Sequence, residues 1–302
     1  MKKVLVSLLV FFLTFLMINA TNLKPYIMAG VEKGDTASVI KKTENMLKNA
    51  GFKIVGAYSP MQDNNRTVIC ATHELIEKSV LAVGGLTAFG SVIRFGFFRN
   101  GDKIEVSYMN PLYWANAYYR SDFPRVEKNY RLLTDKISSA LNGLEEVRNT
   151  GFGSKKGKSV EKLRKYSYMI GMPKFDKVVT IAEKSNHDEM VRRIRKNLAG
   201  KLGGSVLVYE VGYPGKDLTL FGVGLWGMKG EKKFLPVIDY KQPRHVAFMP
   251  YELLVMKDRV VMLHGRFRIA LSFPDLTMGT FMKIVSTPGD IVNSMRILTI
   301  VK

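Results

Sequence analysis

Hydrophobic and polar positions follow two periods along the chain, and each period predicts a different kind of element. Apolar residues three and four positions apart predict helices over 36–50, 126–144 and 186–199. Alternating or continuous apolar runs, bounded by Gly, Asn, Asp and Pro, are typical of strands. Strands are therefore predicted at 24–31, 52–58, 66–72, 91–98, 103–108, 175–183, 205–213 and 217–227, with a further hairpin around 257–258.

Capping side chains stand in front of two of the predicted helices. Asp35 or Thr36 can cap the first helix, and Ser185 or Asn186 can cap the helix over 186–199.

The two halves of the chain share one predicted order of elements: strand, helix, two strands, a looser section, a hairpin and a closing helix. Both halves therefore read as the same kind of unit.

The expected fold class is α+β, with two similar antiparallel-sheet-plus-helix domains in tandem after a signal peptide. Placing Pro111 against Pro274 brings Tyr118 opposite Phe281, which predicts a strand–Pro–helix element near the end of each unit. The expected boundaries are a signal peptide at 1–20, a first domain at 21–147, a basic linker at 148–172 and a second domain at 173–302.

The first twenty residues have the layout of a secretory signal. Lys2 and Lys3 precede an apolar run over 4–18, and the small residue Ala20 follows it. The apolar core is short for a membrane span, which needs about 20 residues. We therefore expect a periplasmic or otherwise exported protein, and the alternative is an uncleaved N-terminus that anchors it to the inner membrane.

The net charge of the chain indicates which classes of partner it favours. The formal net charge is +20, and removal of Lys2 and Lys3 with the leader would lower it by two. Such an excess favours an anionic lipid, an acidic polymer or an acidic protein as partner, and export argues against nucleic acid. A solvated basic surface without a dedicated partner is the alternative. The sequence leaves the oligomeric state undetermined.

Four segments resemble a bacterial family, domain-of-unknown-function family 302 (DUF302). They are "MLKNAGFKIVGAY" and "IRFGFFRNGDKIEVSYMNP" in the first half, and "FMPYELLVMKDRVVML" and "FPDLTMGTFMKI" in the second. The resemblance implies two copies of a strand, helix, strand, hairpin and helix unit. Many members carry Cys-Asn-Pro and Pro-Cys motifs, where this chain has "CATHEL" and Met249-Pro250-Tyr251. The family has no agreed activity, so the resemblance implies a fold and no chemistry.

Catalytic and metal-binding patterns are weak in this sequence. The four histidines form no short-spaced pair of the His-Glu-x-x-His kind, so neither a metal site nor a cofactor is predicted. His73 follows Cys70 by three residues, but a thiol–imidazole pair also needs an orienting group and an oxyanion donor. A single cysteine allows no disulfide within the chain. No catalytic residue is therefore assigned, and an enzyme is the less favoured class.

The aromatic segment "EVSYMNPLYWANAYYR" at 105–120 is the candidate ligand-binding site. Asn110 can cap a helix that begins at Pro111. The rings there exceed what one packing face needs, so we expect some ring surface to stay open. The alternative is that all of them pack against the sheet or the neighbouring domain. Nearby arginines would complement an anionic group. The candidate residues are Tyr108, Tyr113, Trp114, Tyr118, Tyr119, Arg94 and Arg120.

Three functions remain open at this point. The first is an exported, non-enzymatic binding protein for an amphipathic or anionic ligand, or for an envelope partner. The second is an envelope enzyme whose site lies between the two domains. The third is a structural or assembly factor.

Overall fold

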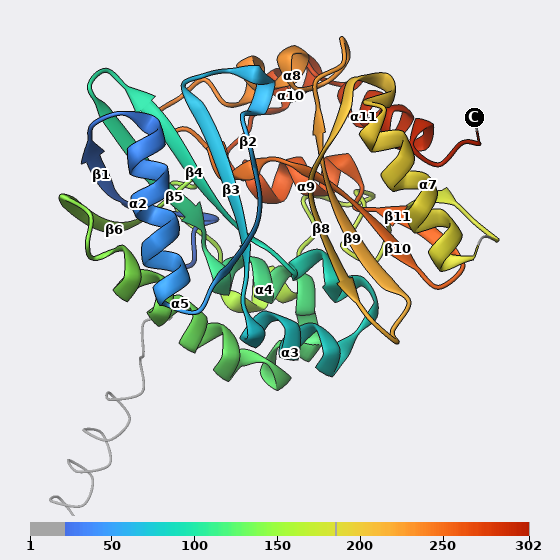
Figure 1. The fold of residues 1–302 in the computed structure, drawn as a ribbon, viewed down its shortest axis with the longest axis horizontal. Coiled ribbons are helices and arrows are strands. Elements are labelled where there is room, and N and C mark those ends of the chain that lie inside the picture. Colours follow the sequence, from blue (N-terminus) through green and yellow to red (C-terminus); the bar gives the residue numbers. More distant parts are fainter. Residues whose placement is uncertain (1–21, 185, 302) are drawn as a thin grey trace, which may run out of the picture.

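Two antiparallel sheets form the centre of the protein in the computed structural model, which describes residues 22–184 and 186–301 (Figure 1). The predicted leader at 1–20 lies outside the described residues. The six-stranded sheet has the order β2-β3-β4-β5-β1-β6, and the five-stranded sheet has the order β7-β11-β10-β9-β8. The strands are β1 (Tyr26–Lys33), β2 (Lys53–Tyr58), β3 (Arg66–Thr72), β4 (Ile93–Asn100), β5 (Lys103–Met109), β6 (Glu146–Phe152), β7 (Val179–Ala182), β8 (Ser205–Tyr213), β9 (Leu218–Leu225), β10 (Tyr251–Met256) and β11 (Arg259–Met262).

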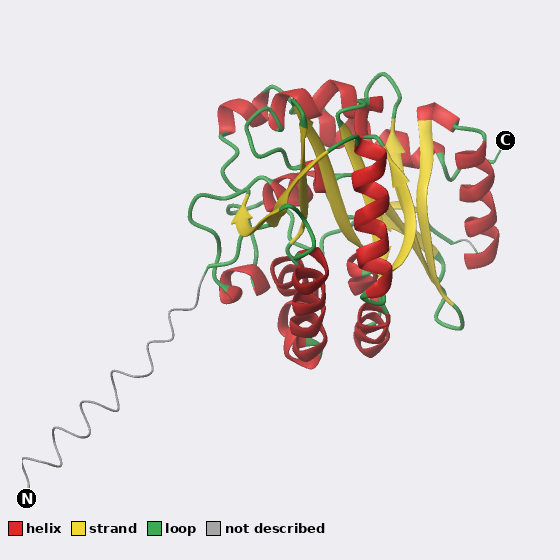
Figure 2. Ribbon diagram, turned by 60° about the vertical axis from the view of Figure 1, so that its left-hand side comes forward, coloured by secondary structure: helices red, strands yellow, loops and turns green. Residues whose placement is uncertain are grey.

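Helices surround the strands on several sides (Figure 2). In the described residues they are α2 (Thr36–Asn49), α3 (Glu74–Val83), α4 (Pro111–Tyr119), α5 (Glu127–Leu141), α6 (Val160–Arg164), α7 (His187–Ala199), α8 (Glu231–Ile238), α9 (Gly265–Ser272), α10 (Met278–Met282) and α11 (Thr287–Ile297). Helices α2 and α5 pack side by side on the first sheet, and α7 and α11 contact the second. The α+β class with two antiparallel sheets is thereby confirmed.

The capping predictions hold where the residues are described. Asp35 accepts a hydrogen bond from the backbone N–H of Ser38 at the start of α2. Asn110 caps α4, with Pro111 at its first position, and Asn186 caps α7. Each cap pairs a backbone N–H that has no partner within its helix.

The first five strands of the six-stranded sheet run β2-β3-β4-β5-β1, and β6 follows at the edge. Read from its β8 edge, the five-stranded sheet runs β8-β9-β10-β11-β7. Helix α4 follows the hairpin β4–β5, and α9 follows the hairpin β10–β11. Asn110 caps α4 and His264 caps α9 with their side chains. The strand–Pro–helix element predicted at Pro274 is wrong, because a helix, α9, and not a strand precedes that proline. The closing segment forms three helices, α9, α10 and α11.

The segment predicted as a basic linker forms part of the fold. Strand β6, which crosses the expected boundary at residue 147, pairs with β1 at the edge of the first sheet. Helix α6 packs against α4, where Arg164 donates from Nε to the side-chain oxygen of Asn116 at 2.8 Å. Four of the five lysines in 148–172 are exposed, so the high lysine content reflects solvent exposure of this segment and not a flexible connection.

The two units interlock through short 3₁₀ helices. The turn η6 (Val246–Phe248) of the second unit packs against β4 and β5, and η3 (Gly85–Gly90) of the first unit packs against β9 and β10. The edge strands β2 and β8 are also in contact. They lie so close together that a Cβ at Gly56 would be 1.8 Å from the carbonyl oxygen of Val208. One continuous hydrophobic core runs through both units.

Candidate functional site

The aromatic segment predicted as a ligand site lies in the core. Tyr113, Trp114, Tyr118 and Tyr119 are each 3% exposed or less, because α4 is enclosed by both units. The expectation that some of this ring surface stays open is wrong. Amphipathic periodicity failed as a guide here, since a helix buried all round has no solvent face.

Each ring of this segment has a structural partner. The Tyr113 hydroxyl donates to the carbonyl of Leu271 at 2.9 Å, and the Trp114 indole N–H donates to the carbonyl of Pro25 at 2.8 Å. Tyr118 stacks on Phe175, with ring centroids 5.0 Å apart. Tyr119 accepts a hydrogen bond from the hydroxyl of Tyr130, and Tyr108 packs against Phe95. The contacts of Tyr113 and Tyr118 join the first unit to the second, and the others lie within the core of the first unit.

The two candidate arginines also serve the fold. Arg94 is 1% exposed and its guanidinium pairs with the carboxylate of Glu252 at 3.0 Å. Arg268 approaches the other carboxylate oxygen of Glu252, also at 3.0 Å. Burial by itself lowers the pKa of Arg94, but the Glu252 carboxylate and the nearby tyrosines Tyr209, Tyr118 and Tyr26 together raise it. Arg120, the least buried of the candidates, pairs with Asp176 at 3.3 Å.

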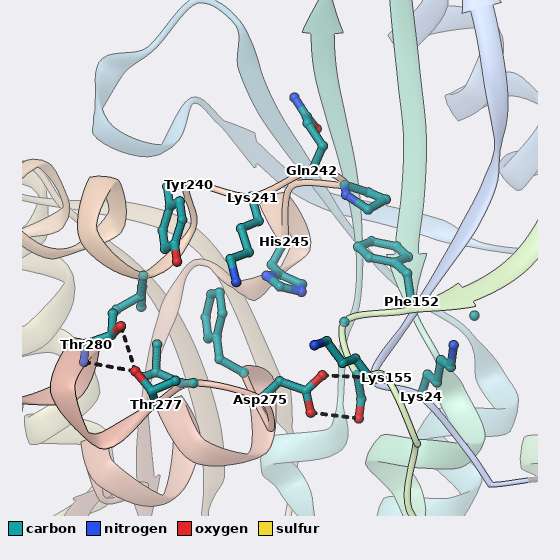
Figure 3. A pocket seen from close by; sticks show the side chains of 17 residues that line it. Lys24, Phe152, Lys155, Tyr240, Lys241, Gln242, His245, Asp275, Thr277 and Thr280 are labelled. Atoms are coloured by element: carbon teal, nitrogen blue, oxygen red, sulfur yellow. Dashed lines mark hydrogen bonds between the residues drawn. The ribbon is translucent and has the colours of Figure 1, made fainter.

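A pocket of about 300 Å³ opens between the two units, and no residue of the aromatic segment lines it. Figure 3 shows that Tyr240, Lys241 and His245 reach it from one side, and Lys24, Phe152 and Lys155 from the other. The first unit contributes the start of β1 and the turn after β6. The second unit contributes residues 238–245 and 273–280.

Aromatic rings form the inner wall of this pocket. The His245 ring stacks on Phe152, with centroids 5.7 Å apart and an interplanar angle of 9°, and meets the edge of Phe273 at 4.5 Å. The backbone N–H of His245 donates to Asp239 at 2.8 Å, which fixes the chain at this point. Gly153 has φ +88°, and a Cβ there would lie 3.0 Å from Nε2 of His245, so a side chain would close this wall.

The rim of the pocket is basic. Lys24, Lys155 and Lys241 line it, and Asp275 is the one carboxylate among its described lining residues. Asp275 already accepts hydrogen bonds from the backbone N–H of Lys155 at 2.6 Å and from the Ser154 hydroxyl at 3.4 Å. The pocket therefore presents three ammonium groups around an aromatic wall, a combination that suits an anion with an apolar body.

Comparisons with known proteins yield one weak likeness. A scan against protein-family models and a search of curated proteins found no match. Among solved structures, the chain is similar to the crystal structure of uncharacterized conserved protein DUF302 from Bacillus stearothermophilus. The TM-score is 0.34 at 13% identity, over 39% of this chain and 95% of that chain.

The residues weighed for catalysis lie in packing or capping roles. Cys70 is fully buried in β3, and burial raises the pKa of its thiol. His73 caps α3 by accepting from the backbone N–H of Leu75 at 3.0 Å, and burial lowers the pKa of its ring. The described ranges contain no group of three His, Cys, Asp or Glu side chains placed to hold a metal ion. Within the same ranges, no helix has the length and hydropathy that a membrane crossing requires.

Sequence reasoning missed every residue of this pocket. Phe152, His245 and Phe273 come from three distant segments, and none belongs to a local motif. One signal was present in the sequence. The segment "GFGSKK" has a phenylalanine between two glycines, and two lysines follow shortly after it. The pocket combines the same residue types, an aromatic ring and lysines.

Proposed function

We propose that this chain is an exported, non-enzymatic binding protein that takes an anionic ligand with an apolar or aromatic body. The observation that carries the proposal is the pocket between the units, with a wall of Phe152, His245 and Phe273 under a rim of three lysines. Export rests on the predicted leader, and the anionic ligand class agrees with the excess of positive charge.

The dimensions and the charge of the pocket define the ligand class. A volume of about 300 Å³ lies at the lower end of small-molecule sites, so one ring system or a short acyl chain fits. Lysine ammonium groups on flexible stems adapt to a carboxylate, sulfonate or phosphate. The stacked rings of Phe152 and His245 offer a flat apolar surface to the rest of the ligand.

We further infer that the two units are copies of one fold of the DUF302 kind. The matching strand orders and the matching cap positions of α4 and α9 support this inference. The quoted segments of the first half, which span α2–β2 and the hairpin β4–β5, add to it.

An envelope enzyme with a site between the units is the second candidate, and His245 is the observation that favours it. Its Nδ1 lies 3.4 Å from the Asp239 carboxylate, in the pocket between the two units. Asp239 also pairs with Arg66 and receives the backbone N–H of His245, so it holds the loop in place. A His245→Gln variant separates the candidates, because it would abolish a turnover but only weaken binding. A third candidate, an assembly factor, would instead co-purify with one stable partner.

Calorimetric titration with naphthalene-1-sulfonate, an aromatic anion, tests the proposal. The wild-type protein should bind it, and the double variant Lys155→Glu/Lys241→Glu should bind at least about tenfold more weakly, because two attractive charges become repulsive. Lys216→Glu/Lys257→Glu is the matched control, since it changes the net charge equally outside the pocket. Naphthalene-1-methanol, which lacks the charge, should bind poorly. Equal affinity of both double variants would contradict the proposal.

A further inference from the structure

Large apolar side chains are exposed together on one face of the second unit. Ile170 is fully exposed at the tip of the loop 168–170, and Met169 beside it is 45% exposed. Met278 and Met282 of α10 are 45% and 56% exposed, and Val285 follows them. Soluble proteins rarely gather so many exposed apolar groups without a partner for them. We call the loop 168–170 and α10 together the loop–α10 face.

The two parts of this face are neighbours in space. Tyr168 and Met172 line a narrow apolar groove with Met278 and Phe281, so the loop lies alongside the start of α10. The hydroxyl of Tyr168 also reaches the carbonyl of Leu276, at 3.5 Å. The loop and α10 therefore border one groove, which Arg266 also lines, and the exposed side chains of both segments lie next to its lining residues in the sequence.

Basic residues flank this apolar surface along the chain. The segment 155–177, which contains the loop, has eight lysines and arginines against Glu161 and Asp176, a net charge of +6. Lys165 and Lys174 are exposed on the two sides of the loop. Residues 276–285, which contain α10, carry Lys283 and no acidic residue.

We propose that the loop–α10 face docks onto an anionic phospholipid bilayer. Ile170, Met169 and Met282 would enter the boundary between headgroups and acyl chains, and the flanking lysines would lie at the anionic headgroups. An apolar centre within a basic surround is the pattern of peripheral membrane-binding surfaces. An acidic protein would complement the lysines, but it would leave the fully exposed Ile170 tip without a counterpart.

Docking in this orientation would bring the ligand pocket close to the lipid. Phe273 and Leu276 line both the apolar groove and the pocket. The proposal itself rests on the exposed apolar side chains and the charge around them, so it holds or fails independently of the ligand pocket.

Co-sedimentation with vesicles tests this proposal. The protein without its leader should bind vesicles of phosphatidylcholine and phosphatidylglycerol, and should bind pure phosphatidylcholine at least tenfold more weakly, since about fivefold in affinity goes with each lysine at an anionic surface. The variant Ile170→Glu/Met282→Glu should lose about tenfold or more on the anionic vesicles. Leu132→Glu, which changes an exposed leucine of α5 outside the face, is the control and should bind like the wild type.

A tryptophan reporter completes the test. Tryptophan in place of Ile170 should shift its emission to the blue on adding anionic vesicles, and tryptophan in place of Leu132 should not. Equal loss of binding in the double variant and in the Leu132→Glu control would overturn the proposal. So would binding that is equal on neutral and anionic vesicles, or capture of an acidic protein with no vesicle binding.

Discussion

Replacing Glu252 by glutamine tests how the two units are held together. Glu252 is 6% exposed and accepts contacts from Arg94 of the first unit and Arg268 of the second, each at 3.0 Å. Two arginines therefore share one buried carboxylate. Glu252→Gln keeps the size of the side chain and leaves both guanidinium groups buried without an anion. We predict that it destabilises the protein more than any single arginine substitution at this cluster.

The expected magnitude follows from the contacts. At 3.0 Å and an effective dielectric constant of about 20, each pair attracts by about 5 kcal/mol, and desolvation of the carboxylate offsets part of that. Breaking a buried ion pair from one side costs about 3–5 kcal/mol, and this is the loss expected for Glu252→Gln. For Arg94→Met the loss should be about 2 kcal/mol, because Glu252 keeps Arg268 as partner.

Urea unfolding at neutral pH, followed by circular dichroism, measures both losses. The midpoint should fall in the order wild type, Arg94→Met, Glu252→Gln, with an unchanged denaturant slope. The reasoning is refuted if Glu252→Gln costs less than about 1 kcal/mol, or if Arg94→Met is the more damaging of the two.

Two further predictions concern other contacts between the units. Burial raises the pKa of Glu231 from 4.5 to about 7, against the hydrogen bonds it accepts from Leu225, Met61 and Tyr58. The folded state therefore holds this proton more tightly than the unfolded chain, so stability from this group should be full below pH 4.5 and fall by about 3 kcal/mol as the pH rises through 7. Urea titrations at pH 5 and pH 8 should show this fall in the wild type and lose most of it in Glu231→Gln; an unchanged pH dependence would contradict the assignment. Gly56→Ala should cost about 3 kcal/mol, measured as a lower melting temperature, since its Cβ would meet a carbonyl of β8, whereas Gly279→Ala, with nothing within 4 Å, should not destabilise the fold.

Local chemistry made much of the fold predictable. Asp35 before α2 and Asn110 before α4 combine a capping side chain with a clear helical pattern, so both starts follow from neighbouring residues alone. The hairpin β4–β5 follows in the same way from Asn100-Gly101 between two apolar runs. These features depend on short-range contacts, which a sequence displays directly.

Features that depend on contacts between the units were not predictable in this way. Tyr113 and Tyr118 of α4 are buried against the second unit, where Tyr113 meets Leu271 and Tyr118 meets Phe175. The sequence also predicts a strand–Pro–helix element at Pro274. In the structure the helix α9, which His264 caps, precedes that proline. The pocket residues Phe152 and His245 meet only after both units have folded.

Native mass spectrometry of the protein, purified from the cells that make it, tests the central claim most directly. We predict one bound anionic, partly apolar molecule per chain in the wild type, and its loss in Lys155→Glu/Lys241→Glu at unchanged near-ultraviolet circular dichroism. A wild-type protein that is free of any ligand, or a variant that retains the same molecule in equal amount, would contradict the claim that the pocket between the units is a binding site.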